Sequence, residues 1–348
     1  MRYPKSLKEN GKIGFVAPSF GCNTEPYKTG FDRALDRFSA LGYETVFGYN
    51  CYEGSGIGIS NTPEKCAQEL MEYYCGEDKG DALISCGGGE LMCETAGLLD
   101  FDRIKAANPK WYMGYSDNTN FTYLLATICD VASVYGPCAG GFGMEEWHPA
   151  LKDAFGIITG ETDTVCGYDG WERESLKSAE NPTPPYNITE KRILQSFVGN
   201  RRINEEDKLD FGGHLIGGCT DCLVNLLGTR LDKTNDFLEK YKNNGFVWFL
   251  ESCDLNVFSI RRAMWQMREA GWFRYAKGFL IGRPYHFGED MMGLDQYDAV
   301  TGILGNLNLP IIMDCDIGHL PPAMPLVTGS MADVSVCGND IRIGMRYV

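Results

Sequence analysis

The chain has 348 residues, of which 47 are acidic and 32 are basic, so its formal net charge at pH 7 is -15. A charge of this sign repels phosphate backbones and anionic lipid, which argues against nucleic acid and membrane surfaces as partners. Hydrophobic residues make up 44% and charged residues 23% of the chain, as in globular proteins, and the sequence holds no long uncharged apolar stretch.

Strand and helix patterns alternate through the first half of the chain. Apolar runs predict strands at residues 12–18, 44–47, 81–85, 111–113 and 131–135. Amphipathic spacing predicts helices at residues 27–41, 62–74 and 121–128, and a further helix that begins near Leu91. This alternation is typical of a parallel sheet covered by helices on both faces, so we expect a Rossmann-like or flavodoxin-like α/β domain over residues 1–155.

A serine stands at the turn between the strand at residues 111–113 and the helix that follows it. Ser116 lies two residues after Gly114, at an expected sheet edge and helix N-terminus, where ligands and oxyanions are commonly bound. It is therefore a candidate nucleophile. Ser-Asp-Asn is also a common helix cap, and the nucleophile elbow G-x-S-x-G has a second glycine where this chain has Asn118. The turn alone leaves both interpretations open.

A run of three glycines, Gly87 to Gly89, follows the strand at residues 81–85. Glycines in such a turn allow the backbone to approach a ligand and to present N–H groups. The run is not a dinucleotide-binding fingerprint, and no P-loop lysine follows it. If Ser116 is a nucleophile, Gly88 or Gly89 is expected to supply one amide of an oxyanion hole and Asp117 the other. A plain tight turn is the alternative.

The alternation of strands and helices fades between residues 156 and 210, which we interpret as a connecting segment. This segment holds Trp171, either a platform for a substrate ring or an aromatic side chain that anchors the segment to the core. Apolar strands follow at residues 245–250, 277–283 and 310–314, and a hairpin with its turn at residues 338–340 is expected near the end. We therefore expect a separate β-rich domain over residues 211–348.

Fourteen cysteines are scattered through apolar segments, which predicts buried thiols in a reducing compartment. Only Cys219 and Cys222 form a C-x-x-C pair, and no second pair completes a zinc site, although His214 lies a few residues upstream. The N-terminal segment lacks the apolar core and cleavage site of a signal peptide. We expect a cytoplasmic protein without a metal or a cofactor.

A serine nucleophile needs a base and an acid that orients the base. Of the four histidines, His286 and His319 lie just past predicted strand ends, and His319 is held between a glycine and a Leu-Pro-Pro run. Glu251 closes the most apolar strand of the second half, where an unpaired carboxylate would be costly. Glu251 is therefore the candidate acid. With Ser116 as the nucleophile and His319 as the base, the triad would occur along the chain in the order Ser116, Glu251, His319.

Five motifs occur in one order over nearly the whole chain: CGGGE at 86–90, GYSD at 114–117, GGCTDCLVNLLGT at 217–229, FLE at 249–251 and DIGH at 316–319. Together they resemble the L,D-carboxypeptidase family of serine peptidases, which includes muramoyltetrapeptide carboxypeptidases and microcin C immunity peptidases. The resemblance implies a triad of Ser116, Glu251 and His319 divided between two domains, with Gly88 and Asp117 in the oxyanion hole. It also implies a flavodoxin-like first domain, no metal and commonly a homodimer.

The activity implied by the resemblance is hydrolysis of the amide bond to the terminal D-alanine of murein tetrapeptides, as in peptidoglycan recycling. Gly89, Trp171 and Arg283 are the candidate substrate-binding residues, with Arg283 as the cation for the substrate carboxylate or else a member of a surface ion pair. The turn CGGGE departs from the Arg-Gly-Gly-Tyr-Gly type of cell-wall recycling members, and Cys219 stands where asparagine is frequent.

The glycine turn and Trp171 are closer to the microcin-immunity branch. The alternative function is accordingly an amidase that cuts aminoacyl-nucleotide analogues. A non-catalytic relative that binds a small molecule is the remaining alternative.

Overall fold

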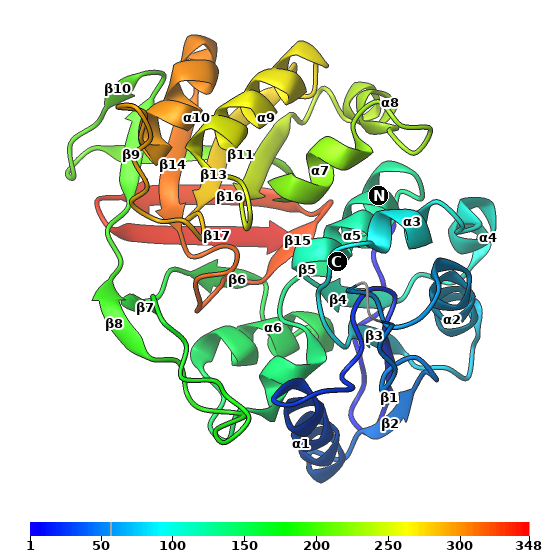
Figure 1. The fold of residues 1–348 in the computed structure, drawn as a ribbon. Helices are drawn as coiled ribbons and strands as arrows, with labels where there is room; N and C mark the ends of the chain where they lie inside the picture. Colours follow the sequence, from blue (N-terminus) through cyan, green and yellow to red (C-terminus); the bar gives the residue numbers. More distant parts are fainter. Residues whose placement is uncertain (56–57, 348) are drawn as a thin grey trace. The chain divides into compact units, whose positions relative to one another are not determined.

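The computed structural model describes residues 1–55 and 58–347. The chain divides into two compact units, which Figure 1 shows in the colours of the sequence. The first unit consists of Met1–Thr162 and Glu174–Asn187, and the second of Asp163–Arg173 and Ile188–Val348. Residues 156–210, expected to form a connector, are thus shared between the two units.

The first unit contains a parallel sheet. Its strands are β1 (Lys12–Val16), β2 (Glu44–Phe47), β3 (Ala82–Ser85), β4 (Trp111–Gly114) and β5 (Ser133–Tyr135). They are hydrogen-bonded in the order β5-β4-β3-β1-β2, and every pair among them is parallel. This is the strand order of flavodoxin-like folds, so the expected fold class is confirmed. In such sheets ligands bind at the carboxyl ends of the strands, near the point where the strand order reverses.

Helices cover both faces of this sheet. The helices are α1 (Tyr27–Ala40), α2 (Pro63–Cys75), α3 (Met92–Ala96), α4 (Phe101–Ala106), α5 (Thr119–Thr127) and α6 (Pro149–Thr159), with short 3₁₀ turns η1 (Ser116–Asn118) and η2 (Ala139–Gly143). Leu70, Tyr74 and Phe121 of α2 and α5 belong to one buried cluster. In a second group of aromatic residues, the ring of Phe15 of β1 packs in a tilted arrangement against that of Phe38 of α1. The predicted strands and helices of this half agree with the structure to within a few residues.

The second unit is built on a nine-stranded mixed sheet of order β10-β9-β14-β13-β12-β11-β16-β17-β6. Its parallel centre consists of β11 (Lys208–Cys219), β12 (Phe246–Glu251), β13 (Ala276–Gly282) and β14 (Pro310–Cys315). Antiparallel strands flank this centre: β6 (Thr164–Cys166), β9 (Gln195–Val198), β10 (Arg201–Arg202), β16 (Met331–Cys337) and β17 (Asp340–Arg346). The remaining strands are β7 (Gly170–Glu172), β8 (Ile188–Lys191) and β15 (Leu326–Thr328).

Helices connect the parallel strands of the second unit. They are α7 (Thr220–Leu226), α8 (Thr234–Lys240), α9 (Val257–Glu269), α10 (Gln296–Leu304) and the 3₁₀ turn η3 (Gly305–Leu307). Because β11 to β14 are neighbours in chain order, right-handed connections place these helices on the same face of the sheet, as Figure 1 shows. The hairpin expected near residues 338–340 is confirmed, since Cys337 pairs with Asp340 across the turn.

The glycine-rich run before α7 is a strand. The sequence pattern predicts no strand in this run, because glycine has a low strand propensity, yet His214 lies inside β11. The glycines are required by close strand contact. A Cβ on Gly217 would lie 1.7 Å from the carbonyl oxygen of Phe249 on β12, and the φ of Gly217 is +151°. Within the described part of the chain, no helix is both long and apolar enough to cross a membrane.

This close contact predicts a large effect of a small substitution. We expect Gly217→Ala to lower the free energy of unfolding by about 3 kcal/mol or more, because a methyl group there meets β12 backbone and forces an unfavourable φ. Gly228→Ala is the matched control, since Gly228 also has a positive φ, +78°, but has open space around its Cα. Gly228→Ala should lower the free energy of unfolding by about 1–2 kcal/mol. Equal losses in urea unfolding of the two variants would contradict the role of strand contact.

Candidate active site

Ser116 adopts a backbone conformation that is uncommon for a non-glycine residue. Its φ is +63°, and it is the first residue of η1, directly after the end of β4 and one extended residue. A left-handed residue at a sharp strand-to-helix turn is the geometry of a nucleophile elbow. The Ser116 N–H donates to Tyr135 Oη at 3.1 Å. The N-caps of η1 and α5 are Tyr115 and Asn118, so the Ser-Asp-Asn run does begin a helix, but its capping residue is Asn118 and not Ser116.

The glycine turn lies against this serine. A Cβ on Gly88 would lie 3.2 Å from Ser116 Cβ and 3.3 Å from Ser116 Oγ, so the two turns are closely packed. Gly89 has a φ of +153°, and a Cβ there would lie 2.1 Å from Ser19 Oγ. Gly89 therefore needs glycine, whereas a Cβ at Gly88 would require Ser116 to shift by only a few tenths of an ångström. The predicted oxyanion-hole glycine and the predicted nucleophile are brought together within the first unit.

Asp117 and Asn118 fix the two turns by hydrogen bonds. The buried Asp117 carboxylate accepts bonds from Ser19 Oγ at 2.5 Å and from the Met92 N–H at 2.9 Å. Asn118 Nδ2 donates to the carbonyl of Gly87 at 2.9 Å. Sequence reasoning missed Ser19. Its position just after the first strand could have indicated its role, because the carboxyl ends of parallel strands lie at one edge of a sheet.

The second unit holds the predicted acid and base in contact. Glu251 is the last residue of β12 and is buried, and His319 lies in the loop after β14. His319 Nδ1 lies 2.9 Å from Glu251 Oε2. Gly318 makes this approach possible, because a Cβ there would lie 2.6 Å from Glu251 Oε2. Of the two histidines left open by the sequence, His319 therefore contacts the acid, whereas His286 lies exposed after β13.

The environment of His319 favours its protonated form. Burial lowers the pKa of His319, but the charge of Glu251 and side-chain hydrogen bonds with Cys253 and Glu251 outweigh burial and raise this pKa well above its ordinary value. A histidine base must be neutral to accept a proton. The competent form of the pair is therefore expected to grow as pH rises through the raised pKa.

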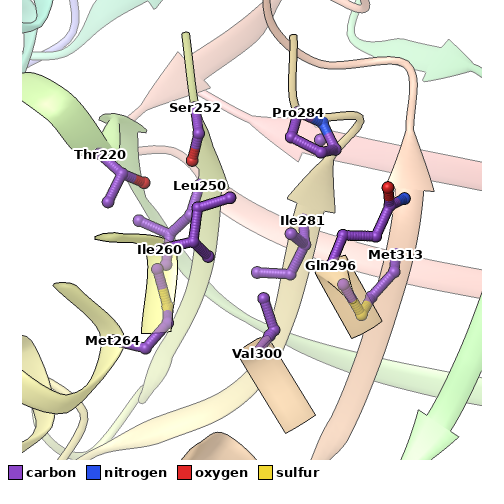
Figure 2. Close-up of a pocket in the computed structure, with 11 residues that line it drawn as sticks. Thr220, Leu250, Ser252, Ile260, Met264, Ile281, Pro284, Gln296, Val300 and Met313 are labelled. Carbon is purple, nitrogen blue, oxygen red and sulfur yellow. The ribbon is translucent and has the colours of Figure 1, made fainter. Parts of the chain in front are cut away.

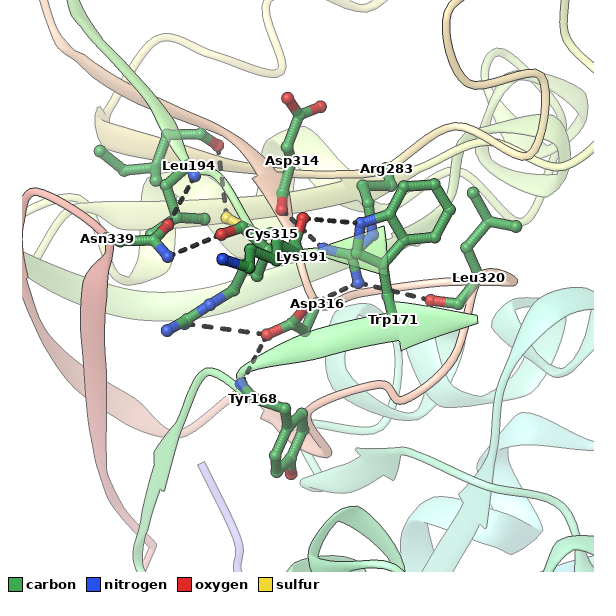
Figure 3. A network of polar contacts seen from close by, with 12 residues as sticks. Tyr168, Trp171, Lys191, Leu194, Arg283, Asp314, Cys315, Asp316, Leu320 and Asn339 are labelled. Carbon is green, nitrogen blue, oxygen red and sulfur yellow. Dashed lines mark hydrogen bonds and ion pairs between the residues drawn. The ribbon is translucent and has the colours of Figure 1, made fainter. Parts of the chain in front are cut away.

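A network of buried charges holds the loop that carries His319 (Figure 3). Arg283 Nη2 lies 2.6 Å from Asp316 Oδ1, and Arg283 Nη1 donates to the Asp314 carbonyl at 2.9 Å. The second Asp316 oxygen accepts the Tyr168 N–H at 2.8 Å. The expected alternative of a surface ion pair for Arg283 is wrong, because its side chain is only 2% exposed. A substrate carboxylate would have to compete with Asp316 for this guanidinium.

Trp171 packs on the same network. It is buried on β7, its Nε1 donates to the Lys191 carbonyl at 3.2 Å, and its ring lies 5.1 Å from that of Phe287. The Arg283 guanidinium lies 5.1 Å from the centre of the indole ring. These contacts are those of an anchoring aromatic residue, the second of the two interpretations that the sequence allows. Within the second unit Trp171 and Arg283 thus support the His319 loop.

A cavity lies on the helix-covered face of β12 (Figure 2). Leu250 and Ser252 on either side of Glu251 line it, together with Ile260 and Met264 of α9. Successive side chains of a strand point to opposite faces, so Glu251 points away from this cavity. The cavity is therefore distinct from the acid–base pair.

Cys219 and Cys222 of the C-x-x-C pair are both in the reduced, thiol form. A side-chain hydrogen bond with Cys222 and burial raise the pKa of Cys219 well above its ordinary value. Among residues 1–55 and 58–347, no group of three or more His, Cys, Asp and Glu side chains is arranged to hold a metal ion.

Models of the two domains of LD-carboxypeptidases match this chain. The N-terminal domain model matches residues 13–136, and the C-terminal domain model matches residues 212–334, so together they account for more than half of the chain. The chain belongs to the LD-carboxypeptidase family. It is accordingly a serine hydrolase of the peptidase class, as expected from its five motifs.

Known relatives resemble the chain over almost its whole length. The microcin C7 self-immunity protein MccF of Escherichia coli is 24% identical over 97% of this chain and 94% of its own. A putative carboxypeptidase of Streptomyces coelicolor is 22% identical over 95% of this chain and 92% of its own. MccF in complex with glutamyl sulfamoyl guanosine shares the fold with a TM-score of 0.79 at 21% identity, over 99% of each chain. An MccF-like protein from Bacillus anthracis does so with a TM-score of 0.80, also at 21% identity, over 99% of this chain and 100% of its own.

The Glu251 contact predicts a shift in the titration of His319. In wild type the imidazole should titrate well above its ordinary pKa near 6.5, and Glu251→Gln should lower this pKa, because it removes the carboxylate charge. A raised folded-state pKa stabilises the fold at low pH, and this contribution is lost as pH rises through it. Nitrogen NMR of His319 between pH 5 and 10 measures both values. An unchanged pKa in Glu251→Gln would contradict the coupling, and His286→Asn is the control that should not alter it.

The buried ion pair predicts a loss of stability. Arg283→Met should lower the free energy of unfolding by about 3–5 kcal/mol, because it leaves Asp316 buried without its closest cation. Lys208→Met removes an exposed ion pair with Asp210 and should cause no measurable change. Denaturant unfolding of both variants measures the difference. A wild-type unfolding midpoint for Arg283→Met would show that the network does not support the fold.

Proposed function

We propose that the chain is a serine carboxypeptidase of the L,D type in which Ser116, His319 and Glu251 act as one triad. The observation that carries the proposal is the left-handed Ser116 turn, with its hydroxyl beside the glycine turn at the carboxyl edge of a parallel sheet. The contact of His319 with Glu251 supports it further, since a base held by a buried acid is the second part that serine chemistry needs.

In the proposed reaction His319 Nε2 accepts the proton of Ser116 Oγ as that oxygen attacks the carbonyl carbon of the substrate. Glu251 accepts the Nδ1–H bond, which sets the tautomer and stabilises the imidazolium that forms. The backbone N–H groups of Gly88 and Asp117 stabilise the oxyanion of the tetrahedral intermediate.

The intermediate then collapses with transfer of the proton from His319 to the leaving amine, so the amide bond breaks and an acyl ester on Ser116 remains. Water attacks this ester and gives its proton to the same histidine. The second tetrahedral intermediate releases the acid, and the proton returns to Ser116. No redox step or cofactor takes part in this sequence of proton and acyl transfers.

The proposed substrate is a murein tetrapeptide, cut between the L-centre of its diamino acid and the terminal D-alanine. The family description and the carboxypeptidase names of several relatives support this choice. The enzyme would then take a small muropeptide as its partner.

The direct test is release of D-alanine from a murein tetrapeptide. Wild type should release it, and Ser116→Ala and His319→Asn should each lower the rate on the order of 10⁴-fold or more. The double variant should be no slower than the slower single variant, because residues that act as one unit lose their effect together. Additive losses, or near-wild-type turnover by Ser116→Ala with an unchanged melting temperature, would contradict the triad.

A second candidate is an amidase that acts on aminoacyl-nucleotide analogues. The similarity to MccF over almost the whole chain favours it, because solved structures of MccF include complexes with glutamyl sulfamoyl guanosine and aspartyl sulfamoyl adenosine. Release of the amino acid from an aminoacyl sulfamoyl adenosine, without release of D-alanine from the tetrapeptide, would select this substrate. The same Ser116→Ala variant should abolish it.

A further inference from the structure

Both proposed substrates carry a negative charge close to the bond that is cut: a C-terminal carboxylate in the tetrapeptide and a phosphate-like group in the nucleotide analogues. A carboxypeptidase or an amidase of this kind therefore needs a cation to hold that charge. Arg283 is already bound to Asp316 and to two carbonyl groups inside the second unit. The first unit, which carries Ser116, offers another cation.

Lys177 lies in the segment Glu174–Asn187, which belongs to the first unit. Its ammonium lies 4.9 Å from the centre of the Tyr27 ring. Tyr27 contacts the ring of Phe20 at 6.0 Å, and the Phe20 N–H donates to the Gly88 carbonyl at 2.8 Å. Two aromatic rings therefore connect Lys177 to the glycine turn that lies against Ser116.

Two buried cysteines lie among the loops at this edge of the sheet. Cys22 follows β1, and its thiol donates to the Cys86 carbonyl at 3.9 Å, where the glycine turn begins. Cys138 follows β5, and its sulfur lies 3.7 Å from Asn118 Nδ2. Both cysteines oppose the effect of burial on the pKa of Lys177, which agrees with the position that the ring contacts give this lysine.

Among the described residues, no carboxylate lies close enough to Lys177 to balance its charge. Over residues 1–55 and 58–347 no ion pair involves it. It is half-buried, and burial lowers its pKa against the smaller opposing effects of Cys22 and Cys138. Holding an ammonium partly out of water without a counter-ion costs free energy, and an anionic ligand would offset this cost.

We propose that Lys177 binds the anionic group of the substrate, a carboxylate or a phosphate, at the carboxyl edge of the first sheet. This inference rests on the proposed role of Ser116 as nucleophile. It assigns to Lys177 the role that the sequence suggests for Arg283. Lys177 acts in specificity and takes no part in proton transfer.

The test measures binding to the full chain carrying Ser116→Ala, so that no turnover interferes. Two pairs of probes differ in the anionic group: murein tetrapeptide against its C-terminal amide, and adenosine monophosphate against adenosine. Lys177→Met should weaken binding of the charged member of at least one pair roughly 10- to 100-fold, as expected when a hydrogen bond to a charged group is lost. Binding of the uncharged member should not change. Loss in the first pair identifies a carboxylate and loss in the second a phosphate.

Two further variants sharpen the result. Lys177→Arg keeps the charge and should retain most of the binding, whereas Lys152→Met removes an exposed lysine of α6 and should have no effect. The proposal is overturned if the ratio of affinities within both pairs is the same before and after Lys177→Met, or if the parent protein prefers the charged member of neither pair. A lower melting temperature with unchanged ratios would mean that Lys177 only packs on Tyr27. Because binding is measured without turnover, failure to release D-alanine would count against the proposed reaction and not against this site.

Discussion

The buried carboxylate of Asp117 links three segments of the chain at the carboxyl edge of the first sheet. It accepts hydrogen bonds from Ser19 after β1, from the Met92 N–H where α3 begins, and from the Asn120 amide in α5. Loss of any one donor would leave a buried charge less well satisfied. Because its neighbour is fixed in this way, Ser116 can keep a left-handed conformation that an unsupported serine would rarely adopt.

In the second unit, buried charges likewise hold the residues of the candidate site in one arrangement. Glu251 ends the apolar strand β12 and is satisfied by His319, while Asp316 is satisfied by Arg283 and by the Tyr168 N–H. A buried ion pair contributes little net stability, but it is costly to break, so it fixes one arrangement of a loop against others. Arg283 binds the carbonyl groups of Asp314, near the end of β14, and of Leu320, so it holds both ends of the segment that contains His319.

Local sequence patterns predicted the features that depend on residues close in the sequence, namely the strands, helices and turns. Strand and helix periodicity gave the order of elements in the first unit, and the turns around Gly88 and Ser116 were recognised because glycine and serine between a strand and a helix have few roles. Patterns could not predict contacts between distant residues. Ser19 and Asp117 are 98 positions apart, and Arg283 and Asp316 are 33 apart, so neither partner indicates the other. Strand β11 was missed because glycines lack strand propensity, although close contact with β12 requires them.

The central claim is that Ser116 is a nucleophile activated by His319. Mass spectrometry of the protein after reaction with a fluorophosphonate tests it most directly, because the reagent marks an activated serine whatever the natural substrate is. The account predicts one phosphonyl group, on the peptide that contains Ser116, with a rate that falls at least 100-fold in His319→Asn. Labelling of another residue, or labelling of Ser116 at the same rate in His319→Asn, would contradict it.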